Sequence, residues 1–302
     1  MANADTLPRT TKKRINSTTV MAWIFILPCL IFMYLCLWRP IFSGAYLSFF
    51  KLRGYTPIEF VGFDNYIKVV TDTNFLKAFF NTVQYVLWEL LLAFVPPIFI
   101  ALMLNEIRIG HKALKFAIYF PAIVPGIVTA MMWRQMYEPN TNGLVNNILV
   151  QMGKDIQPFL NSPKMVIFWI CVSAGWSAMG GNMIYYLSGL QGINSELYEA
   201  AAIEGAGIFR RMWTITIPQI SGIACLFFVK MIIGVFQIME APLTMTDGGP
   251  NNESISLGLQ SYRYAFENFK VEYALALGII QFFMLIGITI FYFRLQKRID
   301  TE

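Results

Sequence analysis

Long apolar runs alternate with polar segments along most of this chain. A helix needs about 20 apolar residues to cross the hydrocarbon core of a bilayer. Six runs approach or exceed that length: residues 20–47, 82–104, 116–136, 165–190, 219–243 and 273–293. The pattern predicts an all-α polytopic membrane protein, with six transmembrane helices over residues 20–302 behind a polar tail over residues 1–19.

Prolines mark the expected irregularities within these runs, because proline lacks an amide donor and disturbs a helix interior. Pro28 and Pro40 are expected to kink the first span, and Pro96-Pro97 to break the second. Pro121 and Pro125 border a flexible start of the third span. Residues 49–80 are amphipathic and are expected to form an interfacial helix, whereas residues 138–164 form a polar loop with helical pieces.

The polar stretch over residues 194–220 lies between the fourth and fifth spans. Asn194, or the serine after it, can cap a helix start, and residues 197–203 are good helix formers. Gly205 interrupts that pattern, a second short helix is expected over residues 208–213, and Pro218 suits the first turn of the next helix. The stretch therefore predicts helix, glycine turn and helix.

Composition agrees with a membrane protein. The chain is 56% hydrophobic and 14% charged, with a mean hydropathy of +0.54, so as a soluble protein it would expose large apolar patches. The net charge of +5 does not indicate nucleic-acid binding, because the basic residues lie between spans and at the chain ends. Their modest excess on one side predicts that both termini and residues 194–220 are cytoplasmic.

Motifs for enzymatic chemistry are missing from the sequence. The Gly153-Lys154 pair lacks the rest of a phosphate-binding loop, so the chain is expected to bind no ATP by that motif. The only histidine is His111, and the four cysteines lie inside apolar runs without zinc or disulfide spacing. We expect no catalytic residue, metal site or cofactor in this chain.

The stretch at residues 194–220 also carries a family resemblance. Glu199-Ala200-Ala201, followed by Gly205 and then Ile217-Pro218, resembles the EAA motif of ABC importer permeases. The string over residues 197–206 is similar to the branch that imports sugars. Further similar tracts are Val61 to Tyr66, Trp133 to Asn147 and Leu243 to Pro250, so the resemblance extends from about Ala22 to the C-terminus.

The resemblance implies a type I ABC importer permease fold in a bacterial or archaeal cytoplasmic (inner) membrane. It implies a heterodimer with a second homologous permease, an ABC ATPase dimer that carries ATP and Mg, and an extracytoplasmic solute-binding protein that delivers a sugar or oligosaccharide. The cytoplasmic coupling loop would be residues 191–219. Its expected ATPase-coupling residues are Glu199, Ala200, Ala201, Gly205, Arg210 and Pro218.

A sugar pathway needs hydrogen-bonding groups for hydroxyls and an aromatic face for the ring. Gln237 and Glu240 are three residues apart in the fifth run, so a continuous helix would place them on one face. Trp176 and Ser177 lie in the fourth run, and Gly126 leaves room in the third. We expect these five residues to line the pathway, with helix-to-helix bonding as the alternative role for Gln237 and Glu240.

Other functions stay open from the residues alone. Glu89, Lys230 and Glu240 are charged groups in or near the spans, and they could serve an ion-coupled secondary transporter or pair between helices. Within the importer family, a glycerol-phosphate permease is the alternative, since an anionic substrate would need a cation such as Lys230. A membrane scaffold without transport fits the intramembrane charges less well.

Overall fold

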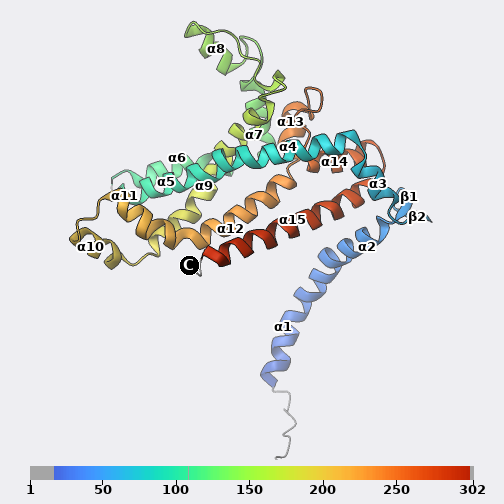
Figure 1. Ribbon diagram of the computed structural model, residues 1–302, viewed down its shortest axis with the longest axis horizontal. Coiled ribbons are helices and arrows are strands. Elements are labelled where there is room, and N and C mark those ends of the chain that lie inside the picture. Colours follow the sequence, from blue (N-terminus) through green and yellow to red (C-terminus); the bar gives the residue numbers. More distant parts are fainter. Residues whose placement is uncertain (1–16, 108, 300–302) are drawn as a thin grey trace, which may run out of the picture.

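The computed structural model describes residues 17–107 and 109–299, and helices make up most of it (Figure 1). Five helices are long and apolar enough to cross a membrane, and a bent helix pair supplies a sixth span. The all-α, six-span prediction is thus confirmed, although the N-terminal tail over residues 1–16 lies outside the described residues. The spans are Val20–Leu47, Thr73–Glu106, His111–Ile123 with Gly126–Met136, Val166–Gln191, Met212–Phe236 and Val271–Arg294.

The first span is an arm that leaves the helical body (Figure 1). It comprises α1 (Ser17–Met33), a π-helical turn at Tyr34–Trp38 and α2 (Arg39–Leu47). The most apolar window of this span has no buried residue, against 39% buried for the span Val166–Gln191. This arm therefore contributes almost nothing to the core of its own chain.

Residues 49–80 differ from the interfacial helix expected from the sequence. A short antiparallel hairpin pairs β1 (Phe50–Arg53) with β2 (Thr56–Phe60), and α3 (Asp64–Val70) follows. Asn65 in α3 fixes this helix to the start of the hairpin, because its buried amide donates to the carbonyls of Ser48 and Phe50. The amphipathic pattern thus belongs to a hairpin and a short helix, and the second span begins at Thr73 rather than Thr82.

The second span is a continuous helix, so the break predicted at Pro96-Pro97 is wrong. α4 (Thr73–Glu89) passes through a π-helical turn at Leu90–Phe94 into α5 (Val95–Glu106). In the π-turn the Val95 amide donates to the Leu90 carbonyl, five residues back. The two prolines follow in the next turn, and the wider π-turn before them lets the helix continue without a break.

The third span is sharply bent. α6 (His111–Tyr119) and a 3-10 turn (Phe120–Ile123) meet α7 (Gly126–Met136) at 95°. Pro121 and Pro125, predicted to border a flexible start of this span, thus lie at its bend. Beyond α7 lie α8 (Leu144–Gln151) and a 3-10 turn at Phe159–Asn161, the helical pieces expected in the loop.

The fourth span, α9 (Val166–Gln191), packs closely against the bend of the third. Gly180 makes this possible, because a Cβ there would lie 2.3 Å from the Ile118 carbonyl oxygen and 2.6 Å from the Tyr119 Cα. Buried side chains around α9 form two of the three hydrophobic clusters, including Ile170, Cys171, Met183 and Tyr186. α9 is thus the central helix of the bundle.

The fifth span ends earlier than its apolar run suggests. α12 (Ile217–Phe236) stops before Gln237, and the next helix, α13, covers Glu240–Thr246. The intervening link is held by α14 (Leu257–Tyr262), whose Gly258 has no room for a Cβ beside the Ile238 carbonyl. The Ser256 hydroxyl also donates to that carbonyl.

The last span, α15 (Val271–Ile299), follows a π-helical turn at Arg263–Glu267. Tyr264 in this turn donates a hydrogen bond to the Asp72 carboxylate at the start of α4. Burial, with the neighbouring carboxylate, raises the pKa of Tyr264 above its usual value. This contact joins the ends of the second and sixth spans.

Candidate functional site

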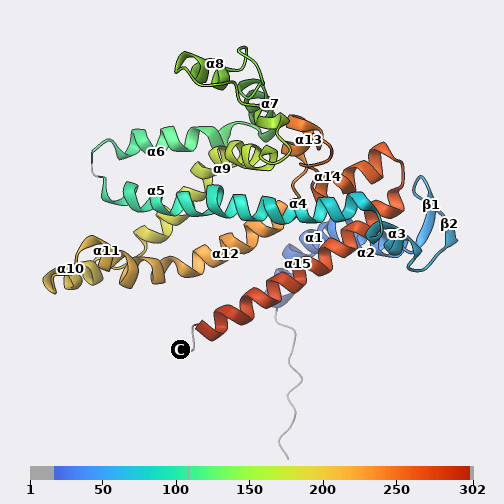
Figure 2. The same ribbon diagram turned by 45° about the horizontal axis from the view of Figure 1, so that its top comes forward.

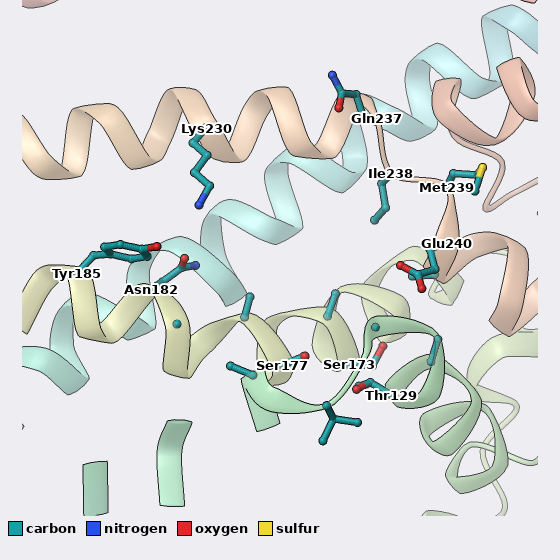
Figure 3. Close-up of a pocket in the computed structure, with 18 residues that line it drawn as sticks. Thr129, Ser173, Ser177, Asn182, Tyr185, Lys230, Gln237, Ile238, Met239 and Glu240 are labelled. Carbon is teal, nitrogen blue, oxygen red and sulfur yellow. The ribbon is translucent and has the colours of Figure 1, made fainter. Parts of the chain in front are cut away.

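A cavity of about 720 Å³ opens between the bent third span, α9 and the end of the fifth span (Figure 3). Its lining is mostly small or polar, with one lysine and one glutamate. The polar lining residues are Thr129, Ser173, Ser177, Asn182, Tyr185, Lys230, Gln237 and Glu240. Four of the five expected pathway residues, Gly126, Ser177, Gln237 and Glu240, line this cavity.

Glu240 and Gly126 meet across the cavity. A Cβ on Gly126 would lie 3.1 Å from Glu240 Oε2, so the glycine leaves space for the carboxylate at the start of α7. The expectation that Gln237 and Glu240 share a helical face is wrong, because α12 ends at Phe236. In Figure 3 the Gln237 side chain points away from α9, whereas Glu240 points towards α7.

Trp176 is not among the cavity-lining residues. Its ring packs edge-on against Trp133, with the ring centroids 5.7 Å apart. Tyr185 is the aromatic residue that lines the cavity instead, one helical turn beyond Gly181. The sequence offered a signal for this face, since small and polar residues recur on α9 at four-residue spacing: Ser173, Ser177 and Gly181, and beside them Ala174, Ala178 and Asn182.

The Asn182 side chain bonds to a backbone carbonyl that a proline of the second span leaves without a donor. Pro97 has no amide to donate to the Ala93 carbonyl four residues back. The Asn182 side-chain amide donates to that carbonyl instead, at 3.1 Å. The residue therefore fixes α9 against the second span while also lining the cavity.

Lys230 projects from α12 towards α9 (Figure 3). Its Nζ lies 5.5 Å from the ring centroids of both Tyr185 and Phe227, a cation–π arrangement. Among the residues that the structure describes, no carboxylate comes within ion-pair distance of Lys230. Glu240 lines the same cavity, whereas Glu89 is buried outside it. The pairing between helices expected for these three charges is therefore not seen among the described residues.

The predicted helix, glycine turn and helix are present at the far end of α12 from the cavity link (Figures 1 and 2). α10 covers Ser195–Ile203, and Asn194 caps it by accepting from the Glu196 amide at 3.1 Å. α11 covers Ile208–Arg211 and ends before the expected Trp213, because a π-helical turn at Met212–Thr216 carries the chain directly into α12. Pro218 occupies the first turn of α12, as predicted.

Gly205 closes α10 by its backbone conformation. Its φ is +76°, and the Ala206 amide donates to the Ala201 carbonyl while the Gly205 amide donates to Ala202, which is a Schellman cap. A Cβ at this position would meet nothing within 4 Å, so the glycine serves the turn rather than packing.

α10 has no buried residue, and Ile203 is 89% exposed. Glu199, Ala200, Arg210 and Pro218 are exposed and Ala201 is half-buried. Within the described part of the chain, Glu199 makes no ion pair with Arg210 or Arg211. The same part contains no group of three or more side chains that could hold a metal ion.

A polar cavity thus lies among the spans, and a continuous helix leads from it to an uncovered helical element. The family model described as "Binding-protein-dependent transport system inner membrane component" matches residues 93–301. The chain belongs to this family, the multi-pass permease subunits of ABC importers, which are the non-catalytic membrane components of their complexes.

Relatives match over nearly the full chain. The arabinooligosaccharides transport system permease protein AraP of Bacillus subtilis is 28% identical, over 92% of this chain and 88% of its own length. The sn-glycerol-3-phosphate transport system permease protein UgpA of Yersinia pestis is also 28% identical, over 80% of this chain and 81% of its own. A bacterial alginate ABC transporter, solved with an alginate pentasaccharide-bound periplasmic protein, contains a chain with a TM-score of 0.83 and 25% identity, covering 93% and 96% of the two chains.

Proposed function

We propose that this chain is a permease subunit that forms part of the pathway for a sugar or oligosaccharide in an ATP-driven importer. The observation that carries the proposal is the 720 Å³ cavity, whose serine, threonine, asparagine and tyrosine side chains offer hydrogen bonds to hydroxyl groups. Relatives that transport arabinooligosaccharides and alginate support a saccharide as the substrate. An extracytoplasmic binding protein would deliver that saccharide.

The exposed helix α10 supports a separate ATPase as partner. Exposed apolar surface of this kind is typical of a protein interface, and Ile203 and Leu197 present it beside Glu199. ATP and Mg would bind to the ATPase dimer. Movement of the ATPase would push α10 and α11, and the continuous helix behind them would carry the displacement to the cavity.

The uncovered arm of the first span supports a second permease subunit. The most apolar window of this span contains no buried residue, which leaves its surface free for a partner, and the main cavity is also open. A homologous permease would complete the pathway. The family likeness supports a bacterial or archaeal cytoplasmic membrane. The distribution of basic residues supports an orientation with both termini and α10 inside.

Lys230 supports a second candidate substrate class. A cation exposed in the cavity without a carboxylate partner among the described residues would suit an anionic substrate, as in the glycerol-phosphate permease relative. Glu240 in the same cavity offsets that charge, so a neutral saccharide remains the first candidate.

The test is uptake by the complete complex in proteoliposomes, with the partner permease, the ATPase and the binding protein. The panel contains maltose, arabinobiose, an alginate trisaccharide and glycerol 3-phosphate. We expect uptake of one saccharide that requires both ATP and the loaded binding protein. Uptake of glycerol 3-phosphate alone would favour the second candidate, and ATP-independent uptake driven by an ion gradient would refute the importer proposal.

A further inference from the structure

A second cavity, of about 250 Å³, adjoins the first and lies between the second span, α9 and α12. Both cavities are lined by Ala178, Asn182, Lys230 and Ile238, so they meet along a common wall. Lys230 stands at that junction.

Two buried side-chain oxygen atoms on the smaller cavity have no hydrogen-bond partner among the described residues. Glu89 is 6% exposed, and its Oε1 accepts no hydrogen bond, although the Cys171 thiol lies beside the carboxyl group. Tyr186 is 1% exposed, and its hydroxyl also has no partner. Most buried polar side-chain atoms in proteins are hydrogen-bonded, so two unpartnered ones on a single small cavity indicate a group that binds there.

Aromatic rings supply the rest of this wall. Phe94, Tyr186 and Phe227 line the cavity, with centroids 6.4 Å apart for Phe94 and Tyr186 and 5.5 Å apart for Tyr186 and Phe227. An apolar aromatic wall combined with a carboxyl and a phenol suits a sugar ring. The C–H face of such a ring is apolar, and its edge carries hydroxyl groups.

We propose that this cavity is an inner subsite that receives one sugar ring of the substrate from the main cavity. Glu89 Oε1 accepts a hydrogen bond from one hydroxyl group of the ring, and the Tyr186 hydroxyl bonds to a neighbouring hydroxyl group. Glu89 and Tyr186 are then specificity-determining residues. The inference rests on the proposed saccharide function, since it requires hydroxyl groups on the substrate.

The inner subsite would discriminate between sugars by their hydroxyl pattern. A site built to hydrogen-bond a hydroxyl rejects an analogue without it, because its buried polar groups are left unpaired. A substrate with the correct hydroxyl groups would give both Glu89 Oε1 and the Tyr186 hydroxyl a hydrogen-bond partner. An analogue lacking one of these hydroxyl groups would leave one of the two atoms without a partner.

The test compares Glu89→Gln and Tyr186→Phe in the complete complex. The substrate is the saccharide from the panel above that the wild type imports, offered with its mono-deoxy analogues at saturating loaded binding protein. Tyr137→Phe is the matched control, because the Tyr137 hydroxyl is likewise buried without a partner but lines neither cavity. The readouts are uptake rate, complex assembly and basal ATPase activity.

We expect the wild type to import the parent sugar about ten-fold faster than one deoxy analogue, as expected for a hydrogen bond to a buried group. In Tyr186→Phe and Glu89→Gln this ratio falls several-fold, while Tyr137→Phe keeps it. Unchanged ratios in Tyr186→Phe, which removes a single oxygen, would overturn the inference even if Glu89→Gln failed to assemble. An equal change in Tyr137→Phe would do the same. In either case wild-type uptake would still support the importer proposal, which fails only if the wild type imports no saccharide.

Discussion

Gly180 offers a sharp test of how the fold supports the cavity. Gly180→Ala would place a Cβ 2.3 Å from the Ile118 carbonyl oxygen, a separation that real Cβ contacts essentially never show. Backbone atoms cannot turn aside as a flexible side chain can, so α9 and the bent third span must separate. Because the corner of that span leads to Gly126, the movement would also alter the cavity wall.

The size of the effect follows from two opposing contributions. Overpacking costs about 1–3 kcal/mol, and overlap with backbone belongs at the upper end of that range. Alanine is a better helix former than glycine by about 1 kcal/mol, which leaves a net loss of about 2 kcal/mol. Gly181→Ala is the matched control, because a Cβ there meets nothing within 4 Å and only the gain in helix propensity applies.

The assay is thermal unfolding of the purified permease in detergent, followed by tryptophan fluorescence. The two variants differ by about 3 kcal/mol, which corresponds to roughly 6–12 °C at about 2–4 °C per kcal/mol. We expect Gly180→Ala to lie below the wild type and Gly181→Ala at or above it. Midpoints that agree within about 2 °C would show that the close approach of α9 to the bend has been misread.

Three further predictions concern transport. Gly205→Val puts a branched side chain at a φ of +76° and should abolish ATP-coupled uptake while the spans still insert; wild-type uptake would contradict the coupling role of α10. In sealed cells, a cysteine introduced at Gly110 should resist an impermeant thiol reagent, and one introduced at Asp155 should react. Labelling at residue 110 would contradict the predicted orientation. Glu240→Ala should lower uptake several-fold, because losing a hydrogen bond to substrate costs about 0.5–1.5 kcal/mol. The loss should exceed that of Gln237→Ala, because the Gln237 side chain points away from α9. Equal effects of the last two variants would count against the cavity geometry.

The sequence predicts the spans well because a bilayer imposes one requirement, an apolar length, that can be counted along the chain. It predicts the ends of the fifth span poorly. Residues 237–243 are apolar enough to continue a helix, and the chain leaves the helix there because α14 packs against the Ile238 carbonyl. That contact joins segments far apart in sequence, but Pro242 is a local signal for the break, because it has no amide to donate to the Ile238 carbonyl four residues back.

The residues of the candidate site also differ in how far the sequence predicts them. Glu240 could be expected in the cavity because a charge is unusual in an apolar run, and the structure places it beside Gly126. Trp176 and Tyr185 could not be distinguished, since either aromatic side chain suits a sugar and only the rotation of α9 decides which one lines the cavity. The sequence shows Glu89 as a charge within a span, but the inner cavity beside it depends on the packing of three spans.

The π-helical turn at Met212–Thr216 fixes how two distant parts of the chain are rotated relative to each other. From α11 to the end of α12 the chain is one unbroken helical rod. Deleting one residue from that turn would shorten the rod by only about 1.5 Å, but it would rotate Lys230 by about 100° around the helix axis relative to α11. Natural variation should therefore exchange side chains freely along the lipid-facing side of this rod, while insertions and deletions between Gly207 and Lys230 are selected against. The number of residues in this segment carries more information than their identity.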